Sequence, residues 1–223
     1  MKRRVLFQGD SITDTDRSKN EDWMNNTKSV IGLGKGYPSY VSAALSYEHP
    51  GEYEFLNRGL GGSRIVDLYA RIKSDIINLK PDILSILIGV NDVWHEIGRH
   101  NGVDAEKYEI IYDMMIQQIK QALPDIKIMI LEPFVLPGSA TLPNDEHPDR
   151  WEIFSREVPL RARASERIAK KYGLVFVPLQ SEFDTLSKNC EMGSWLCDGV
   201  HPAPAGHELI KRAWIKAFYE NIR

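Results

Sequence analysis

Cysteine is scarce in this chain of 223 residues, which contains only Cys190 and Cys197. Two cysteines cannot form the multi-disulfide framework of small secreted domains, and their spacing matches no zinc signature. Long apolar runs are absent too. The stretch 83–90 is interrupted by Ser85 and Gly89, whereas a membrane-spanning helix needs about 20 apolar residues. We therefore expect reduced thiols and no membrane span.

An excess of positive charge is also missing. The chain has 28 Lys and Arg against 31 Asp and Glu, a net charge of −3, which argues against nucleic acid or an anionic membrane as a partner. The first residues are basic, but the apolar run that follows is only Val5–Phe7, and a secretory signal needs about 7–15 apolar residues. These features predict a cytoplasmic protein that binds neither nucleic acid nor membrane.

Short apolar runs alternate regularly with amphipathic segments. Residues 64–79 show the clearest helical stripe, because their apolar residues recur at spacings of three and four. The helix expected over 150–172 should bend or break at Pro159. Strands are predicted at 4–8, 53–56, 82–89, 127–132 and 174–179, and helices at 37–47, 64–79, 105–122, 150–172 and 204–219, with a short helix before the last.

Five strands separated by helices predict a parallel sheet covered on both faces. We expect an α/β, doubly wound, flavodoxin-like three-layer sandwich with strand order 2-1-3-4-5. The length and the lack of a repeat or linker predict a single domain over residues 1–223. In such sheets ligands bind at the carboxyl ends of the strands. The segments there are 9–36, 57–63, 89–103, 133–149 and 180–203.

Two polar motifs follow predicted strands. Gly9-Asp10-Ser11 comes directly after the first strand, where a serine can expose its hydroxyl and its own N–H. Gly89-Val90-Asn91-Asp92 ends the predicted central strand, where a neutral amide can donate to a developing oxyanion. Each motif alone has an ordinary explanation, since Ser and Asp cap turns and Asn-Asp is a common turn.

A glycine-rich motif, Asn57-Arg58-Gly59-Leu60-Gly61-Gly62, follows the second strand. Its glycines let the backbone approach a ligand and leave N–H groups free to donate. The alternatives are a tight turn or a dinucleotide-binding fingerprint. The fingerprint fails because its third glycine position is Arg64, and because the next strand ends in Gly89-Val90 instead of an acid.

Asp198-Gly199-Val200-His201-Pro202 precedes the last predicted helix. A carboxylate three residues before a histidine can accept from Nδ1–H and leave Nε2 to take a proton from serine. A lone histidine in a loop is more often simply solvated. The six histidines include no His-x-x-x-His pair, so no metal site is predicted.

All four motifs fall at the carboxyl edge of the predicted sheet, so they should meet in one place. Together they supply a nucleophile (Ser11), a base (His201), a residue that orients the base (Asp198) and oxyanion donors. The Gly-x-Ser-x-Gly elbow of α/β-hydrolases is absent, because its last position is Thr13. The sequence resembles the SGNH hydrolases, also called GDSL esterases and lipases, whose four blocks carry Ser, Gly, Asn and His in this order.

This resemblance covers residues 9–201. It implies an oxyanion hole formed by the N–H groups of Ser11 and Gly62 and the side-chain amide of Asn91. Between Gly61 and Gly62 we choose Gly62, since the family's donor usually closes the turn. The resemblance implies neither a metal nor an organic cofactor.

A closer likeness, to the intracellular acetylxylan esterases, implies release of acetyl groups from xylo-oligosaccharides through an acyl-enzyme, and a homo-oligomer. There is one departure. A bulky aromatic residue is expected just before the catalytic Asp, but Cys197 stands there, with Trp195 two residues earlier. The motifs that carry this likeness are Gly9–Asp14, Gly34–Tyr37, Asn91–Trp94, Val200–Pro202 and Ala205–His207.

We therefore predict an ester hydrolase acting on a small-molecule ester, an acetylated sugar. The alternative within the family is a lipase, lysophospholipase or thioesterase acting on a longer acyl chain, which would need a longer apolar groove. A binding module without chemistry would lack at least one of Ser11, Asn91 and His201. The long loop 133–149 lies at the same edge, and the sequence leaves open whether it shapes the acyl pocket or bridges subunits.

Overall fold

The computed structural model of the chain describes residues 2–27 and 29–223. Each predicted strand is present, with ends within two residues of the expected ones. The strands are β1 (Arg3–Gly9), β2 (Tyr53–Asn57), β3 (Ile83–Leu87), β4 (Lys127–Leu131) and β5 (Val175–Val177). The α-helices are α1 (Ser11–Asp14), α2 (Glu21–Met24), α3 (Tyr37–Glu48), α4 (Ile65–Ala70), α5 (Ile72–Asp75), α6 (Val90–Arg99), α7 (Ala105–Ala122), α8 (Arg150–Tyr172), α9 (Gln180–Ser187) and α10 (Pro204–Asn221).

The five strands form one sheet in the order β2-β1-β3-β4-β5, and every neighbouring pair is parallel. The predicted doubly wound α/β fold and its strand order are therefore confirmed. Strand β1 pairs Phe7 with Asn57 of β2 and Gly9 with Leu87 of β3. Because these strands run in the same direction, their carboxyl ends meet at one edge of the sheet.

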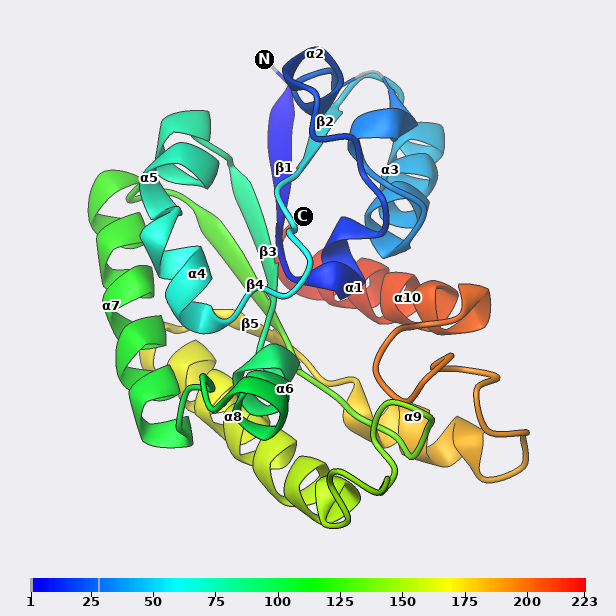
Figure 1. Cartoon of the computed structure of the whole chain (residues 1–223). Coiled ribbons are helices and arrows are strands. Elements are labelled where there is room, and N and C mark those ends of the chain that lie inside the picture. The colour runs from blue at the N-terminus through cyan, green and yellow to red at the C-terminus, as the bar shows by residue number, and fades with distance from the viewer. Residues whose placement is uncertain (1, 28) are drawn as a thin grey trace.

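Helices cover both faces of the sheet, with α3 and α10 on one side and α4, α5, α7 and α8 on the other (Figure 1). Successive side chains of a strand point to opposite faces, so Phe7 packs in the α3–α10 core and Leu6 in the α7–α8 core. Ser85 interrupts the apolar run of β3, but its hydroxyl accepts from the indole N–H of Trp214 at 3.0 Å. The buried strands thus account for the apolar runs in the sequence.

Helix α6 was not predicted from the sequence, which treated 89–103 as a connecting segment. Gly89, at φ 137°, lies two residues after β3 as the N-cap of α6, and the chain turns there directly into Val90–Arg99. Val90, Val93 and Ile97 are buried along one face of this helix, and their spacing was the available signal. The Asn-Asp pair resembled a turn but lies in the first helical turn, which places Asn91 at the carboxyl edge of the sheet.

The two long helix predictions had different outcomes. The segment 64–79 is divided into α4, α5 and a 3-10 turn (Ile77–Leu79), because the backbone leaves helical geometry at Arg71 and Ile76. Ile65, Leu68, Ile72 and Ile76 of its apolar stripe are nevertheless buried. The periodicity therefore identified the buried face correctly, but the prediction of one continuous helix was wrong. Helix α8, in contrast, runs without interruption through Pro159.

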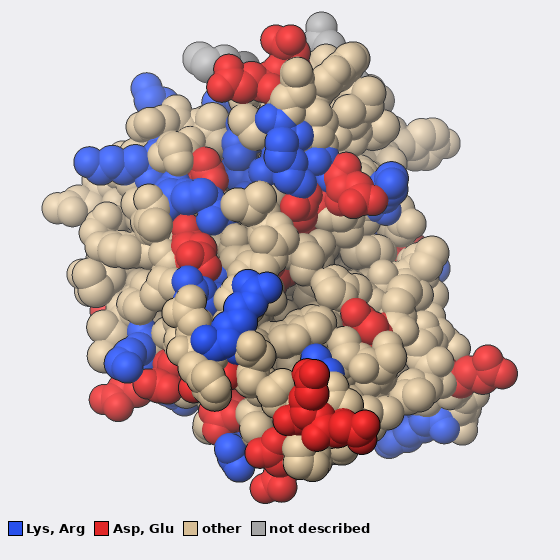
Figure 2. Space-filling view, in the orientation of Figure 1, with Lys and Arg blue, Asp and Glu red and all other residues tan. Residues whose placement is uncertain are grey.

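Acidic and basic side chains lie among one another on the face shown in Figure 2, and no patch of one sign covers it. Among the helices of the described residues, none is both long enough and apolar enough to cross a membrane.

Candidate active site

Ser11 opens the one-turn helix α1, directly after β1. Asp10 is the N-cap of this turn, since its Oδ1 accepts from the N–H of Ile12 at 2.9 Å. The turn is thus capped by Asp10, and the hydroxyl of Ser11 is left free for another partner. Asp10 is buried, and this burial raises the pKa of its carboxyl to about 7.

The three residues predicted to act together are joined by hydrogen bonds. Ser11 Oγ lies 2.9 Å from Nε2 of His201, and Nδ1 of the same ring lies 2.7 Å from Oδ2 of Asp198. The other carboxylate oxygen of Asp198 accepts from the N–H groups of Val200 at 2.9 Å and His201 at 2.8 Å. The turn therefore holds Asp198 and His201 in register, and the imidazole faces Ser11.

The electrostatics suit a base held by a charged partner. Burial works to raise the pKa of Asp198, but the hydrogen bonds from the His201 ring and two backbone N–H groups outweigh it and lower this pKa to about 2. The hydrogen bond to Asp198 in turn raises the pKa of His201, against the opposing effect of burial. Asp198 is therefore ionised at neutral pH, and His201 is a stronger base than an exposed histidine.

Three N–H donors near Ser11 have no acceptor among the described residues: the backbone N–H groups of Ser11 and Gly62 and the Nδ2 of Asn91. Gly61 is different, because its N–H donates to Oδ2 of Asp14 at 3.1 Å. Gly62, at φ 78°, holds a left-handed backbone that favours glycine. Asn91 lies close enough to Asp10 to lower that carboxyl's pKa, yet its amide forms no hydrogen bond of normal geometry with it.

Asn57, the last residue of β2, ties the glycine turn to the serine turn. Its Oδ1 accepts from the N–H of Gly59 at 2.8 Å, and its Nδ2 donates to the carbonyls of Thr13 at 2.6 Å and Leu33 at 2.8 Å. The sequence marked Asn57 only as the start of the glycine motif. Its role as a bridge depends on contacts between segments far apart in the chain.

Asp92 plays a similar part behind Asn91. Its buried carboxyl accepts from the N–H of Ile65, the first residue of α4, at 3.0 Å, and burial raises its pKa to about 8. The side chains of Asn91 and Asp92 thus serve different ends: the amide remains unpartnered beside Ser11, and the carboxyl anchors α6 to α4.

A cavity of about 530 Å³ opens beside the serine and is lined by Ser11, Gly61 and His201, by the segment Asp14–Asp16, and by Tyr40 and His207 among others. Trp94 of α6 packs against the His201 ring, with centroids 5.9 Å apart. Trp94 belongs to the sequence motif Asn91–Trp94, but the motif alone did not indicate that its ring lies beside His201. Within residues 2–27 and 29–223, no cluster of three or more His, Cys, Asp or Glu side chains is arranged to hold a metal ion.

Comparison with known families agrees with this geometry. A model of the GDSL-like lipase/acylhydrolase family matches residues 7–209 of the chain. The chain belongs to this family. The resemblance drawn from the four sequence blocks is therefore confirmed, and this GDSL-family esterase is a carboxylic ester hydrolase, as predicted.

Individual relatives cover nearly the whole GDSL-family esterase. It is 32% identical over 219 residues to an acetylxylan esterase of Geobacillus stearothermophilus, covering 96% of this chain and 92% of the relative. The crystal structure of a GDSL-like lipase from Parabacteroides merdae has a TM-score of 0.88 and 31% identity, covering 97% and 96% of the two chains. The structure of the Geobacillus acetylxylan esterase has a TM-score of 0.80 and 30% identity, covering 96% and 93%.

In this esterase the loop 133–149 supports the Asp198 turn. The N–H of Leu136 donates to the carbonyl of Gly199 at 2.9 Å, and the N–H of Ala140 donates to that of Asp198 at 2.8 Å. Gly138 packs so closely that a Cβ there would lie 2.3 Å from the carbonyl carbon of Asp198. The loop therefore positions Asp198, a role that the sequence did not suggest, while any contact between subunits stays a prediction.

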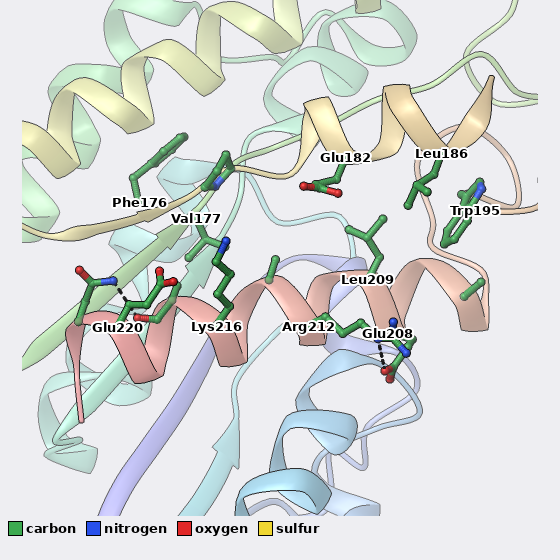
Figure 3. Close-up of a pocket in the computed structure, with 15 residues that line it drawn as sticks. Phe176, Val177, Glu182, Leu186, Trp195, Glu208, Leu209, Arg212, Lys216 and Glu220 are labelled. Atoms are coloured by element: carbon green, nitrogen blue, oxygen red, sulfur yellow. Dashed lines mark hydrogen bonds and ion pairs between the residues drawn. The ribbon is translucent and has the colours of Figure 1, made fainter.

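A second cavity of the GDSL-family esterase, of about 590 Å³, lies between β5, α9 and α10 (Figure 3). Val177, Leu186 and Leu209 line it with apolar side chains, and the described residues that line it include neither serine nor histidine. Trp195, the aromatic residue two positions before Cys197, lines this second cavity and is not among the residues that line the one beside Ser11. The aromatic ring beside His201 is that of Trp94, so the chain departs from the expected pattern here.

Replacing Gly138 by alanine should lower kcat/KM on a simple acetate ester by about 10²-fold, the scale of a misplacement of ~1 Å in an active site. The added methyl group must displace the backbone of Asp198, and hence the His201 ring. Gly98→Ala is the matched control, since a Cβ at Gly98 meets nothing within 4 Å. Steady-state kinetics on both variants test this, and wild-type rates for Gly138→Ala would show that the loop does not position Asp198.

Proposed function

We propose that this esterase removes acetyl groups from acetylated carbohydrates through a covalent acyl-enzyme formed on Ser11. The observation that carries the proposal is the hydrogen-bonded series Ser11–His201–Asp198 beside three unpartnered N–H donors. The relative from Geobacillus stearothermophilus supports it, since its solved structures include catalytic mutants in which a serine and an aspartate are replaced by alanine.

In the first half of the reaction, Ser11 Oγ attacks the ester carbonyl carbon while its proton passes to Nε2 of His201. The carbonyl electron pair moves onto oxygen, which accepts hydrogen bonds from the N–H groups of Ser11 and Gly62 and the amide of Asn91. Collapse of this intermediate breaks the bond to the alcohol oxygen. The alcohol leaves with the proton that His201 returns to it.

In the second half, a water molecule attacks the acyl carbon and gives a proton to His201. The same donors hold the new oxyanion. Its collapse breaks the bond to Ser11 Oγ, which takes the proton back and releases acetate. The ionised Asp198 keeps Nδ1 of His201 protonated throughout and stabilises the imidazolium formed in each half.

The acetylated sugar is proposed from the relative described as an acetylxylan esterase and from the polar side chains that line the cavity, such as Asp16 and Lys35. The alternative substrate is an ester with a longer acyl chain, and the relative described as a GDSL-like lipase supports it. A homo-oligomer and a cytoplasmic location, both expected from the sequence, stay predictions.

Ser11→Ala should reduce kcat by about 10⁶-fold, the cost of losing the nucleophile in a serine hydrolase. The fold should persist, because a small side chain at the edge of the cavity is shortened. The measurement is a single-turnover assay together with covalent labelling by an organophosphonate, which should mark only the wild type. Activity within tenfold of the wild type would contradict the acyl-enzyme mechanism.

Activity should rise with pH through one ionisation whose midpoint lies above the ordinary histidine value of about 6.5, because the hydrogen bond to Asp198 raises the pKa of His201 and only neutral imidazole accepts the serine proton. Asp198→Asn should move the midpoint to lower pH and reduce kcat by up to ~10⁴-fold. Profiles of kcat/KM against pH for both proteins test this. An unchanged midpoint in the variant would remove Asp198 from the proposed role.

Rates on aryl esters with one leaving group should fall steeply as the acyl chain grows from two to eight carbons. A site sized for acetyl excludes further methylenes, and overpacking costs about 1–3 kcal/mol. A lipase would instead gain roughly 0.8 kcal/mol for each buried methylene. The slope of log kcat/KM against chain length therefore has opposite signs in the two cases, and a rising slope would favour the longer acyl substrate.

A further inference from the structure

A second histidine lines the cavity beside Ser11, and no step of the proposed reaction uses it. His207, in the first turns of α10, shares this cavity with Ser11 and His201. Only 7% of the residue is exposed. Because the side chain is almost fully buried and still borders the cavity, a ligand bound in the cavity can contact it.

The ring of His207 is held in a single orientation. The backbone N–H of Tyr37, at the start of α3, donates to its Nδ1 at 3.2 Å. The ring of Tyr40 meets it edge-on, with centroids 6.3 Å apart and planes at 70°. On another side the backbone packs so tightly that a Cβ at Gly36 would lie 2.7 Å from Cε1. Together these contacts fix where the second ring nitrogen, Nε2, points.

The same contacts determine which ring nitrogen of His207 carries the proton. Because Nδ1 accepts a hydrogen bond from a backbone N–H, the proton of the neutral ring is on Nε2. Burial, with His201 adding to it, lowers the pKa of His207 to about 4, so the ring is neutral at neutral pH. Its Nε2 donates to none of the described residues. His207 thus offers an N–H donor that does not compete with His201 for the serine proton.

The position of His207 separates it from the oxyanion donors. Gly62 and Asn91 follow β2 and β3, whereas His207 lies where α10 meets α3 and shares its wall of the cavity with Tyr40 and Lys35. The ring of His207 thus comes from a different part of the fold than the donors predicted for the carbonyl oxygen.

We propose that His207 is a substrate-binding residue whose Nε2–H donates a hydrogen bond to a hydroxyl or ring oxygen of the sugar that carries the acetyl group. This inference rests on the proposed deacetylation of carbohydrates. A buried donor of fixed direction discriminates strongly, since an ester without the matching oxygen leaves it unpaired. His207 would thus favour polyhydroxylated alcohols over plain ones.

Two substitutions separate this role from a structural one. In His207→Asn, the amide oxygen can take the place of Nδ1 as acceptor for the Tyr37 N–H, while the Nε2–H donor is lost. In His207→Gln, the longer side chain can carry its amide N–H to the position of Nε2. The test measures kcat and KM of each protein on an acetylated xylo-oligosaccharide and on phenyl acetate. The ratio of the two kcat/KM values within one preparation is independent of the fraction that is folded.

His207→Asn should lower kcat/KM on the sugar by about 3- to 12-fold, the worth of one neutral hydrogen bond, mostly through KM, with phenyl acetate within twofold of the wild type. His207→Gln should recover part of the preference. Equal losses on both substrates, or no loss on the sugar, would overturn the proposal. If the wild type does not deacetylate the xylo-oligosaccharide at all, the proposed substrate class has failed, and this is visible before any variant is measured.

Discussion

The parallel pairing of β1 with both β2 and β3 is the constraint on which the candidate active site depends. It brings three strand ends to one edge, so that the serine turn, the glycine turn and Asn91 need only a few residues each to meet. The pairing extends past the strands themselves, since the N–H groups of Arg58 and Leu60 donate to the carbonyls of Phe7 at 2.8 Å and Gly9 at 3.1 Å. The site is thus built on buried, rigid backbone, which favours preorganised catalysis.

The part of the site that contains His201 and Asp198 is held in place in a different way. His201 and Asp198 lie in a loop between α9 and α10, and the backbone bonds from Leu136 and Ala140 supply the rigidity that a strand end would otherwise give. Within this frame the carboxyls divide by their partners. Asp198 accepts three hydrogen bonds and has a low pKa, whereas burial dominates at Asp10 and Asp92 and raises theirs. Charge is concentrated on the carboxyl that faces the base.

The same reasoning distinguishes the two histidines of the cavity. His201 has a carboxylate partner, which favours its charged form and raises its pKa, whereas His207 has only a backbone N–H and a buried setting, which lower its pKa. One ring is therefore suited to accept a proton and the other to donate a hydrogen bond. Two residues of one type, six positions apart, acquire different chemistry from their neighbours alone.

The sequence by itself determined the five strands, their order and the family, because apolar runs, turn residues and short motifs are local signals that survive without the fold. It also predicted Ser11, Gly62, Asn91, Asp198 and His201 as site residues, since their motifs follow predicted strands or lie in the last loop at the same edge. Only the tertiary structure decided that 133–149 supports Asp198 and that the backbone N–H of Tyr37 holds the ring of His207 through its Nδ1. Each of these depends on contacts between segments distant in the chain, and burial, tautomer and backbone packing have no counterpart in local periodicity.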